Sequence, residues 1–254
     1  MARIAVFDSG LGSLSIIKAV QKKCKAEIIY FADRENFPYG KKSSNQLKQI
    51  IKKSIKTLET EFNPDLIVIG SNTPTIMFDL TTEYILGVNP PIKEAAKKTK
   101  SKNIGILATE ALVKSDQLTK YIKNSKISND IKIHKINASN LVQLVESGKF
   151  LENKTYCKNV VKKSLESIIL KNNIDTLTLS STHLPFLESI LKSVFPNIRF
   201  IDPADRIAEK ICKVTQKKSS NRNLLKIYSS DKTGELEKNL RSINIDNQIN
   251  YLSI

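Results

Sequence analysis

The 254-residue sequence contains no tryptophan, eight glycines, two histidines and three cysteines. With 6% aromatic residues in all, it offers few of the stacking platforms that single-stranded nucleic acids need. Two histidines and widely spaced cysteines do not make a zinc site, so no metal is expected. Cys24, Cys157 and Cys212 are odd in number and far apart. We therefore expect neither a disulfide framework nor a metal box, which fits a reducing cytoplasm.

Long apolar runs are also absent. No stretch approaches the roughly 18 uninterrupted apolar residues of a transmembrane helix, so no membrane span is expected. The opening residues 1–7 run straight into Asp8 and lack the apolar length of a secretion signal, which predicts a cytoplasmic protein. Hydrophobic residues make up 40% of the chain, as in a folded globule.

Positive charge is plentiful. The chain has 41 Lys and Arg against 25 Asp and Glu, a formal net charge of +16. The lysines occur in small groups spread along the whole chain, mostly on polar sides of helical patterns, and no nucleic-acid motif accompanies them. We therefore expect no nucleic-acid partner, and a positive field that attracts small anionic substrates.

Short apolar runs alternate with helical patterns. Strands are predicted at Arg3–Phe7, Glu27–Phe31, Asp65–Gly70, Asn103–Ala108, Ile131–Ile136, Asp175–Leu179, Ile198–Ile201 and Leu224–Tyr228. Helices are predicted at Asn45–Phe62, Leu112–Lys123, Ser139–Ser147, Asn153–Leu170, Leu187–Val194, Ala204–Thr215 and Gly234–Ser242. Strands separated by crossover helices predict an α/β fold with doubly wound parallel sheets.

Two segments resemble each other. Val68–Pro74 and Leu179–Pro185 both end an apolar strand with a small polar run followed by proline. Ligands of open α/β sheets bind at the carboxyl ends of strands, so the two segments suggest two similar lobes that face each other across a cleft. Helix N-caps explain the same Ser and Thr runs equally well, and both readings stay open.

A glycine-containing turn follows the first strand. Gly10-Leu11-Gly12-Ser13-Leu14-Ser15 is similar to a dinucleotide fingerprint, and a nucleotide-dependent enzyme is therefore an alternative. However, Asp8 would place a negative charge where a pyrophosphate would lie. Backbone amides at a helix start bind carboxylates as well, and we favour a carboxylate ligand.

Four motifs occur in a fixed order. They are Val6–Gly12, Tyr30–Asp33 with Pro38-Tyr39-Gly40, Ser71-Asn72-Thr73, and Ser181–Pro185. Together they resemble glutamate racemase, over nearly the whole chain. The resemblance implies two α/β lobes related by pseudo-two-fold symmetry, at 1–93 with 207–254 and at 94–206. It also implies no cofactor, a small carboxylated amino acid (glutamate or aspartate) as ligand, and allows a homodimer.

The resemblance also implies a site. Racemisation needs two opposed acid/base groups, for which the family uses cysteines; this chain has Ser71 and Ser181 there. An alcohol is far less acidic than a thiol and is a poor base unless a neighbour takes its proton. The implied catalytic residues are Ser71, Ser181, Asp8, His183, Glu146 and Asp33. The implied substrate contacts are Asp8, Ser9, Pro38, Tyr39, Gly40, Asn72, Thr73, Thr182 and His183.

These departures leave other functions open. The alternatives to a racemase are a one-sided isomerase or lyase acting on a small dicarboxylate, and a non-catalytic amino-acid-binding protein. Leu112 stands where the family prefers threonine, which bears on the substrate's distal group. His134 lies alone in a strand pattern, and we interpret it as structural.

Overall fold

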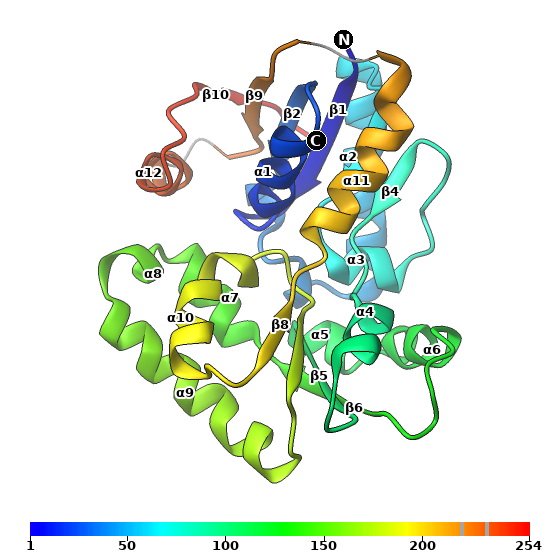
Figure 1. Cartoon of the computed structure of the whole chain (residues 1–254). Coiled ribbons are helices and arrows are strands. Elements are labelled where there is room, and N and C mark those ends of the chain that lie inside the picture. Colours follow the sequence, from blue (N-terminus) through cyan, green and yellow to red (C-terminus); the bar gives the residue numbers. More distant parts are fainter. Residues whose placement is uncertain (219–220, 232–233) are drawn as a thin grey trace. The chain divides into compact units, whose positions relative to one another are not determined.

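The computed structural model describes residues 1–218, 221–231 and 234–254 (Figure 1). They form two compact units. Unit 1 comprises Met1–Val88 and Ala204–Ile254, and unit 2 comprises Asn89–Pro203. The sequence-based ranges for the two lobes are 1–93 with 207–254 and 94–206. They place each point where the chain passes from one unit to the other a few residues further along the chain.

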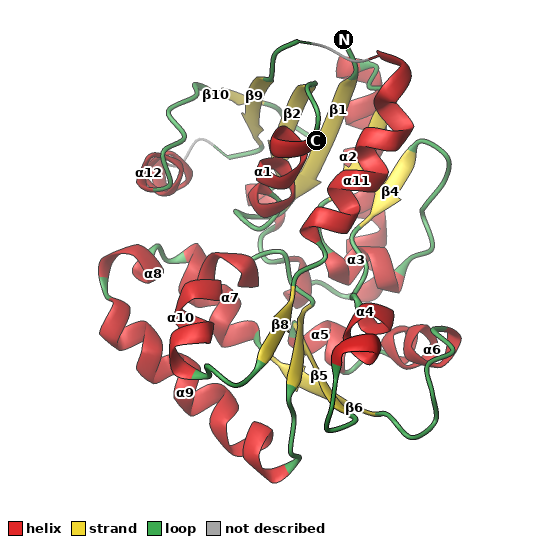
Figure 2. Cartoon of the chain, in the orientation of Figure 1, coloured by secondary structure: helices red, strands yellow, loops and turns green. Residues whose placement is uncertain are grey.

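Unit 1 contains a six-stranded sheet in which every neighbouring pair is parallel (Figure 2). The strand order is β10 (Ile249–Tyr251), β9 (Leu224–Ser229), β2 (Glu27–Ala32), β1 (Arg3–Asp8), β3 (Leu66–Ile69) and β4 (Ile85–Gly87). Strands β1, β2, β3 and β9 lie where the sequence predicted them. Strands β4 and β10, of three residues each, are too short to give an apolar pattern and were not predicted.

Helices cover both faces of this sheet. They are α1 (Leu14–Lys23), α2 (Ser44–Phe62), α3 (Asn72–Met77), α11 (Ala204–Thr215) and α12 (Gly234–Ser242), with the 3-10 turns η1 (Arg34–Asn36), η2 (Tyr39–Lys41) and η4 (Gln216–Lys218). The apolar stripe of α2 packs on one sheet face, in a core that includes Phe7, Phe31 and Ile69. Helices α1 and α11 pack on each other in front of the sheet in Figure 1. The unit is therefore doubly wound.

A disulfide joins these two helices. Cys24, at the end of α1, is bonded to Cys212 of α11, with Cα atoms 5.7 Å apart and a sequence separation of 188. The prediction that the cysteines form no disulfide was wrong for this pair, because only the fold brings the two helices together. The third cysteine, Cys157, is a buried free thiol. Cysteine usage therefore gives no support to a reducing compartment.

Unit 2 contains a four-stranded sheet that is also entirely parallel. The strand order is β6 (Lys132–Asn137), β5 (Asn103–Ala108), β7 (Thr176–Leu179) and β8 (Arg199–Ile201). The helical segments are α4 (Ile92–Lys98), α5 (Glu110–Val113), α6 (Asp116–Asn124), α7 (Ser139–Glu146), α8 (Lys149–Glu152), α9 (Lys154–Lys171), η3 (Leu184–Leu187) and α10 (Glu188–Val194).

The single helix predicted over Leu112–Lys123 is two helices, α5 and α6. Helix α5 ends at Val113, and the hydroxyl of Ser115 accepts a hydrogen bond from the Leu118 amide at the start of α6. A serine that caps a new helix in this way ends the preceding one, although the apolar pattern continues across it. Leu112 is fully buried.

The two sheets share one strand order. In unit 1 the order β2-β1-β3-β4 matches β6-β5-β7-β8 in unit 2, with β9 and β10 added at one edge of unit 1. In each unit, the second strand pairs with one edge of the first strand, and the third strand pairs with the opposite edge. The strand order therefore reverses between β1 and β3 in unit 1 and between β5 and β7 in unit 2, and each reversal is a topological switch point. The prediction of two similar parallel-sheet lobes is confirmed. Within the described ranges, no helix is long and apolar enough to cross a membrane.

Candidate active site

The predicted site residues follow the carboxyl ends of strands. In unit 1, Asp8 and Ser9 lie at the end of β1, Asp33 follows β2, and Ser71 lies two residues beyond β3. In unit 2, Ser181 lies two residues beyond β7. Ser71 and Ser181 therefore occupy equivalent places in the two sheets, each beside the switch point where open parallel sheets bind ligands.

The turn after β1 is closely held. Asp8 is 1% exposed, and its Oδ1 accepts a 2.7 Å hydrogen bond from the Ser9 amide. The hydroxyl of Tyr30 donates a 2.7 Å bond to the carbonyl of Gly10. These bonds fix a buried carboxyl group at the end of the strand, next to a turn that leads into α1.

Gly70 lets this turn approach β3. A Cβ added at Gly70 would lie 2.4 Å from the Ser13 Cβ and 3.0 Å from the Phe7 carbonyl oxygen. We therefore expect Gly70→Ala to displace the turn and lower the free energy of unfolding by about 1–3 kcal/mol, as overpacking does. Urea denaturation followed by circular dichroism measures this. Gly234→Ala is the matched control, since a Cβ there meets nothing within 4 Å; equal stability of the two variants would contradict the prediction.

The segment after β3 offers a hydroxyl and an amide oxygen. Ser71 is half-buried, precedes α3 in an extended conformation, and its side chain makes no cap bond to that helix. Asn72 donates a 2.9 Å bond from Nδ2 to the Val88 carbonyl. Its Oδ1 is buried and has no hydrogen-bond partner among the described residues. A buried acceptor is costly to leave unpaired, so it is suited to a ligand donor such as an ammonium group.

Asp33 is fully enclosed by donors. Its carboxylate accepts bonds from the Tyr39 hydroxyl at 2.9 Å, the Asn36 amide at 2.8 Å and the Ser230 hydroxyl at 3.2 Å. Burial raises the pKa of Asp33, an effect that these three donors oppose. Burial, with Asp33 and Asp8 nearby, holds the pKa of Tyr39 well above its usual value. The carboxylate therefore joins the segment with Pro38, Tyr39 and Gly40 to the end of β9, which favours a positioning role.

Removing the Tyr39 hydroxyl tests this anchor. We expect Tyr39→Phe to leave the Asp33 carboxylate with one donor fewer and to lower the free energy of unfolding by about 1–3 kcal/mol. The measurement is chemical denaturation at neutral pH. Tyr84→Phe is the control, because Tyr84 is 51% exposed. An unchanged midpoint for Tyr39→Phe would mean that the bond contributes nothing.

In unit 2, three side chains form a hydrogen-bonded series. Glu146 ends α7, and its Oε1 lies 2.6 Å from His183 Nε2. The other ring nitrogen, Nδ1, lies 3.5 Å from Ser181 Oγ. The three residues are 2%, 6% and 6% exposed. When the carboxylate accepts the Nε2–H, Nδ1 carries a lone pair towards the serine, so the imidazole can serve as its base.

Two further residues that were singled out from the sequence lie in unit 2. Thr182, beside the series, is buried. His134 pairs through Nε2 with Asn103 Oδ1 at 3.1 Å, between adjacent strands β6 and β5. Burial, followed by nearby Lys132, lowers the pKa of His134. Both residues of this pair belong to the body of the sheet.

Two residues of this network were not predicted. Ser230 bonds to Asp33, and Ser180 bonds to Thr178 at 2.8 Å. The signal for both was their place directly after a strand, the same signal that identified Ser71. In the part of the chain that the structure describes, no group of three or more His, Cys, Asp or Glu residues is placed to hold a metal ion.

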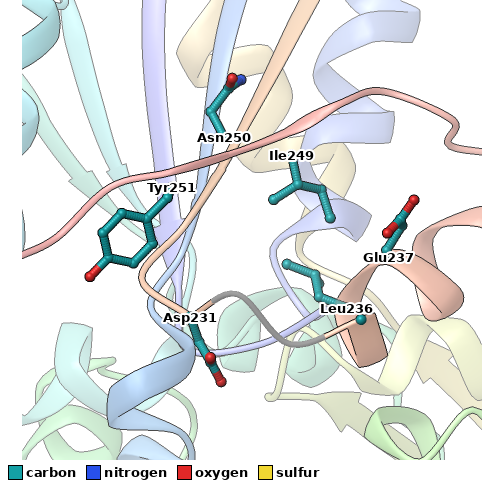
Figure 3. A pocket seen from close by; sticks show the side chains of 7 residues that line it. Asp231, Leu236, Glu237, Ile249, Asn250 and Tyr251 are labelled. Carbon is teal, nitrogen blue, oxygen red and sulfur yellow. The ribbon is translucent and has the colours of Figure 1, made fainter.

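A pocket of about 280 Å³ lies elsewhere in unit 1 (Figure 3). It is lined by Asp231, Gly234, Leu236, Glu237, Ile249, Asn250 and Tyr251, from the end of β9, α12 and β10. None of the predicted site residues lines it. The candidate site is therefore identified by its strand ends and hydrogen bonds, not by this cavity.

Comparison with known proteins identifies relatives over most of the chain. No family model matches. The glutamate racemase of Buchnera aphidicola subsp. Schizaphis graminum is 35% identical over 230 residues, covering 87% of this chain and 88% of the relative. That of Aliarcobacter butzleri is 30% identical over 227 residues, covering 85% of each.

Solved structures show the same fold. The glutamate racemase isoform RacE1 of Bacillus anthracis superposes with a TM-score of 0.84 at 24% identity, covering 100% of this chain and 98% of the other. The Escherichia coli glutamate racemase, in complex with L-glutamate and an activator, gives 0.83 at 24% identity with 99% and 98% coverage. On the strength of the sequence relatives, this chain belongs to the glutamate racemase family, whose members are isomerases.

Proposed function

We propose that the chain interconverts L- and D-glutamate by removing the α-proton on one face and returning a proton on the other. The observation that carries this proposal is the Ser181–His183–Glu146 series, which supplies an acid/base group at a strand end. Solved relatives are complexes with L-glutamate and with D-glutamate, which supports glutamate over aspartate as the ligand.

Unit 1 supplies one set of groups for the proposed reaction. Asp8 and Ser71 lie at the ends of adjacent strands β1 and β3, and we assign them to one face of the α-carbon. Asn72 Oδ1 accepts from the substrate ammonium group. Ser9, Thr73 and the segment with Pro38, Tyr39 and Gly40 are assigned to the substrate as well. Asp33 positions that segment and does not itself exchange protons.

Unit 2 supplies the other set of groups. As Ser181 Oγ takes the α-proton, its own hydroxyl proton moves to His183 Nδ1, and the Glu146 carboxylate stabilises the imidazolium that results. The reverse transfer returns a proton to the α-carbon. Imidazole has a reference pKa of about 6.5, so it can both accept and donate protons near neutral pH. Thr182 is assigned to the substrate.

Solvent deuterium exchange tests the proposal. The enzyme is incubated in D2O with L-glutamate or D-glutamate, and deuterium at the α-carbon is followed by mass spectrometry while optical rotation reports inversion. We expect both enantiomers to exchange and interconvert. Absence of exchange from either enantiomer at high enzyme concentration rejects the proposal, and ligand-dependent thermal stabilisation without exchange then identifies an amino-acid-binding protein.

A second candidate is a one-sided isomerase or lyase that acts on a small dicarboxylate. The asymmetry of the two halves favours it, because an imidazole and a carboxylate support Ser181 in unit 2, whereas the Ser71 side chain makes no cap bond to α3. Exchange from a single enantiomer without inversion supports this candidate. A substrate screen by mass spectrometry then identifies the compound.

The cytoplasmic location and the homodimer remain predictions. Cell fractionation tests the first, and sedimentation velocity at several protein concentrations tests the second.

A further inference from the structure

We propose that Ser181 is an activated nucleophile and that the chain catalyses hydrolysis of esters of small carboxylic acids. The proposal goes beyond racemisation and does not depend on it, because all the residues that it needs lie in unit 2. It rests on the local geometry of Ser181, His183 and Glu146.

The series has the order of groups that activates a serine. A carboxylate orients a histidine, and the histidine faces a hydroxyl. The 2.6 Å bond to Glu146 fixes Nε2 as the protonated nitrogen and leaves Nδ1 as the base. The 3.5 Å separation of Nδ1 from Ser181 Oγ is long, as such contacts often are without substrate.

The backbone around Ser181 has a suitable form. The residue follows buried strand β7 and precedes η3, and the Leu184 amide donates a 3.0 Å bond to the Ser181 carbonyl, closing a turn. Nucleophilic serines of α/β enzymes lie on such strand-to-helix turns. The neighbouring Ser180–Thr178 bond, 2.8 Å long, stabilises the start of the turn.

The chemistry of an alcohol favours this reaction over proton abstraction from carbon. Abstraction of the weakly acidic α-proton by Ser181 is slow, because the imidazole must at the same time remove a hydroxyl proton that is much less acidic than a thiol proton. Attack on an ester needs no free alkoxide, because the proton moves to the base as the new bond forms. A serine held by an imidazole and a carboxylate is therefore better suited to acyl transfer.

The reaction balances in two steps. Ser181 Oγ bonds to the ester carbonyl carbon, its proton moves to His183 Nδ1, and the alcohol leaves with that proton. Water then attacks the acyl-serine and gives a proton to Nδ1. Ser181 leaves as the hydroxyl with the proton returned, so ester and water become acid and alcohol.

p-Nitrophenyl acetate is the probe. We expect a burst of p-nitrophenol and one acetyl group that peptide mass spectrometry maps to Ser181. Ser181→Ala abolishes both, and Ser181→Cys retains acylation because a thiol is also a nucleophile. Ser147→Ala is the matched control: this exposed serine follows Glu146 and its hydroxyl donates to the Leu144 carbonyl of its own helix, so its variant acylates like the wild type.

Two variants examine the series itself. His183→Gln is expected to slow acylation by about 10²–10⁴-fold, the usual contribution of a general base. Glu146→Gln is expected to slow it by roughly tenfold or more, because its amide can donate to Nε2 and leave Nδ1 protonated and unable to act as base. Circular dichroism and thermal midpoints verify that each variant folds.

Several results overturn the proposal. Acetyl groups found only on lysines, a burst that persists in Ser181→Ala, or equal acylation rates in the wild type and folded His183→Gln each show that Ser181 is not activated. These outcomes are separate from racemisation, because deuterium exchange can fail while Ser181 acylates, and the reverse.

Discussion

Replacing Ser71 and Ser181 together by cysteine is expected to raise the rate of glutamate α-proton exchange by about 10²–10⁴-fold, the range that a well-matched acid/base group contributes. The reason is acidity. A thiol has a reference pKa of about 8.5 and forms a useful fraction of thiolate near neutral pH, which an alcohol does not. Asp8 ends β1, which pairs with the strand β3 that Ser71 follows, and His183, bonded to Glu146, lies 3.5 Å from Ser181.

The single variants Ser71→Cys and Ser181→Cys distinguish the contribution of unit 1 from that of unit 2. Because Ser181 has an imidazole neighbour and the Ser71 side chain makes no cap bond to its helix, Ser71→Cys is expected to give the larger single gain. Ser147→Cys, which adds a thiol at an exposed site, is the control and should leave exchange unchanged. A folded double variant that exchanges no deuterium would falsify the assignment of these serines to the reacting α-carbon.

Breaking the Cys24–Cys212 bond is expected to lower the free energy of unfolding by about 2–5 kcal/mol. The bond spans 188 positions in sequence, and in the chain-entropy model the constraint on the unfolded chain increases with loop length. Cys24→Ser with Cys212→Ser and reduction of the wild type by dithiothreitol should give the same loss. Urea titrations with and without reductant measure it.

The double variant also serves as the control for the effect of dithiothreitol. Dithiothreitol should shift the wild-type midpoint and leave the midpoint of the double variant unchanged, because the remaining Cys157 is a free thiol. Alkylation followed by mass spectrometry counts the thiols in each sample. A wild-type midpoint that is insensitive to reductant, with all thiols counted as free, contradicts the prediction.

The apolar periodicity was sufficient to predict most of the fold. Helices α11 and α12 have the predicted bounds, because each is an amphipathic helix that ends where the pattern ends. The division at Ser115 was not predictable, since a side-chain cap and an exposed helical serine look alike in sequence. Strands β4 and β10 are extended because each pairs with a longer neighbouring strand, and their local sequence does not indicate that pairing.

The candidate site residues could be named from the sequence, but the hydrogen bonds among them could not. Strand ends and the resemblance identified Glu146, Ser181 and His183, whereas only the structure shows that they form one series. The same holds for Asp33. The resemblance implied a catalytic role, which stays a prediction, and the sequence did not indicate the three donors that bind the carboxylate. Long-range partners such as Ser230 and Cys212 depend on topology, which residue patterns do not specify.

The disulfide also determines how the polypeptide responds to cleavage. Unit 1 is made of two separate stretches of chain, and Cys24 lies in the first while Cys212 lies in the second. A protease that cuts once, anywhere from residue 25 to 211, therefore leaves a single covalent molecule until a reductant is added. Cuts at both ends of unit 2 would release residues 89–203 as a fragment. The two stretches of unit 1 would then still migrate together on a non-reducing gel.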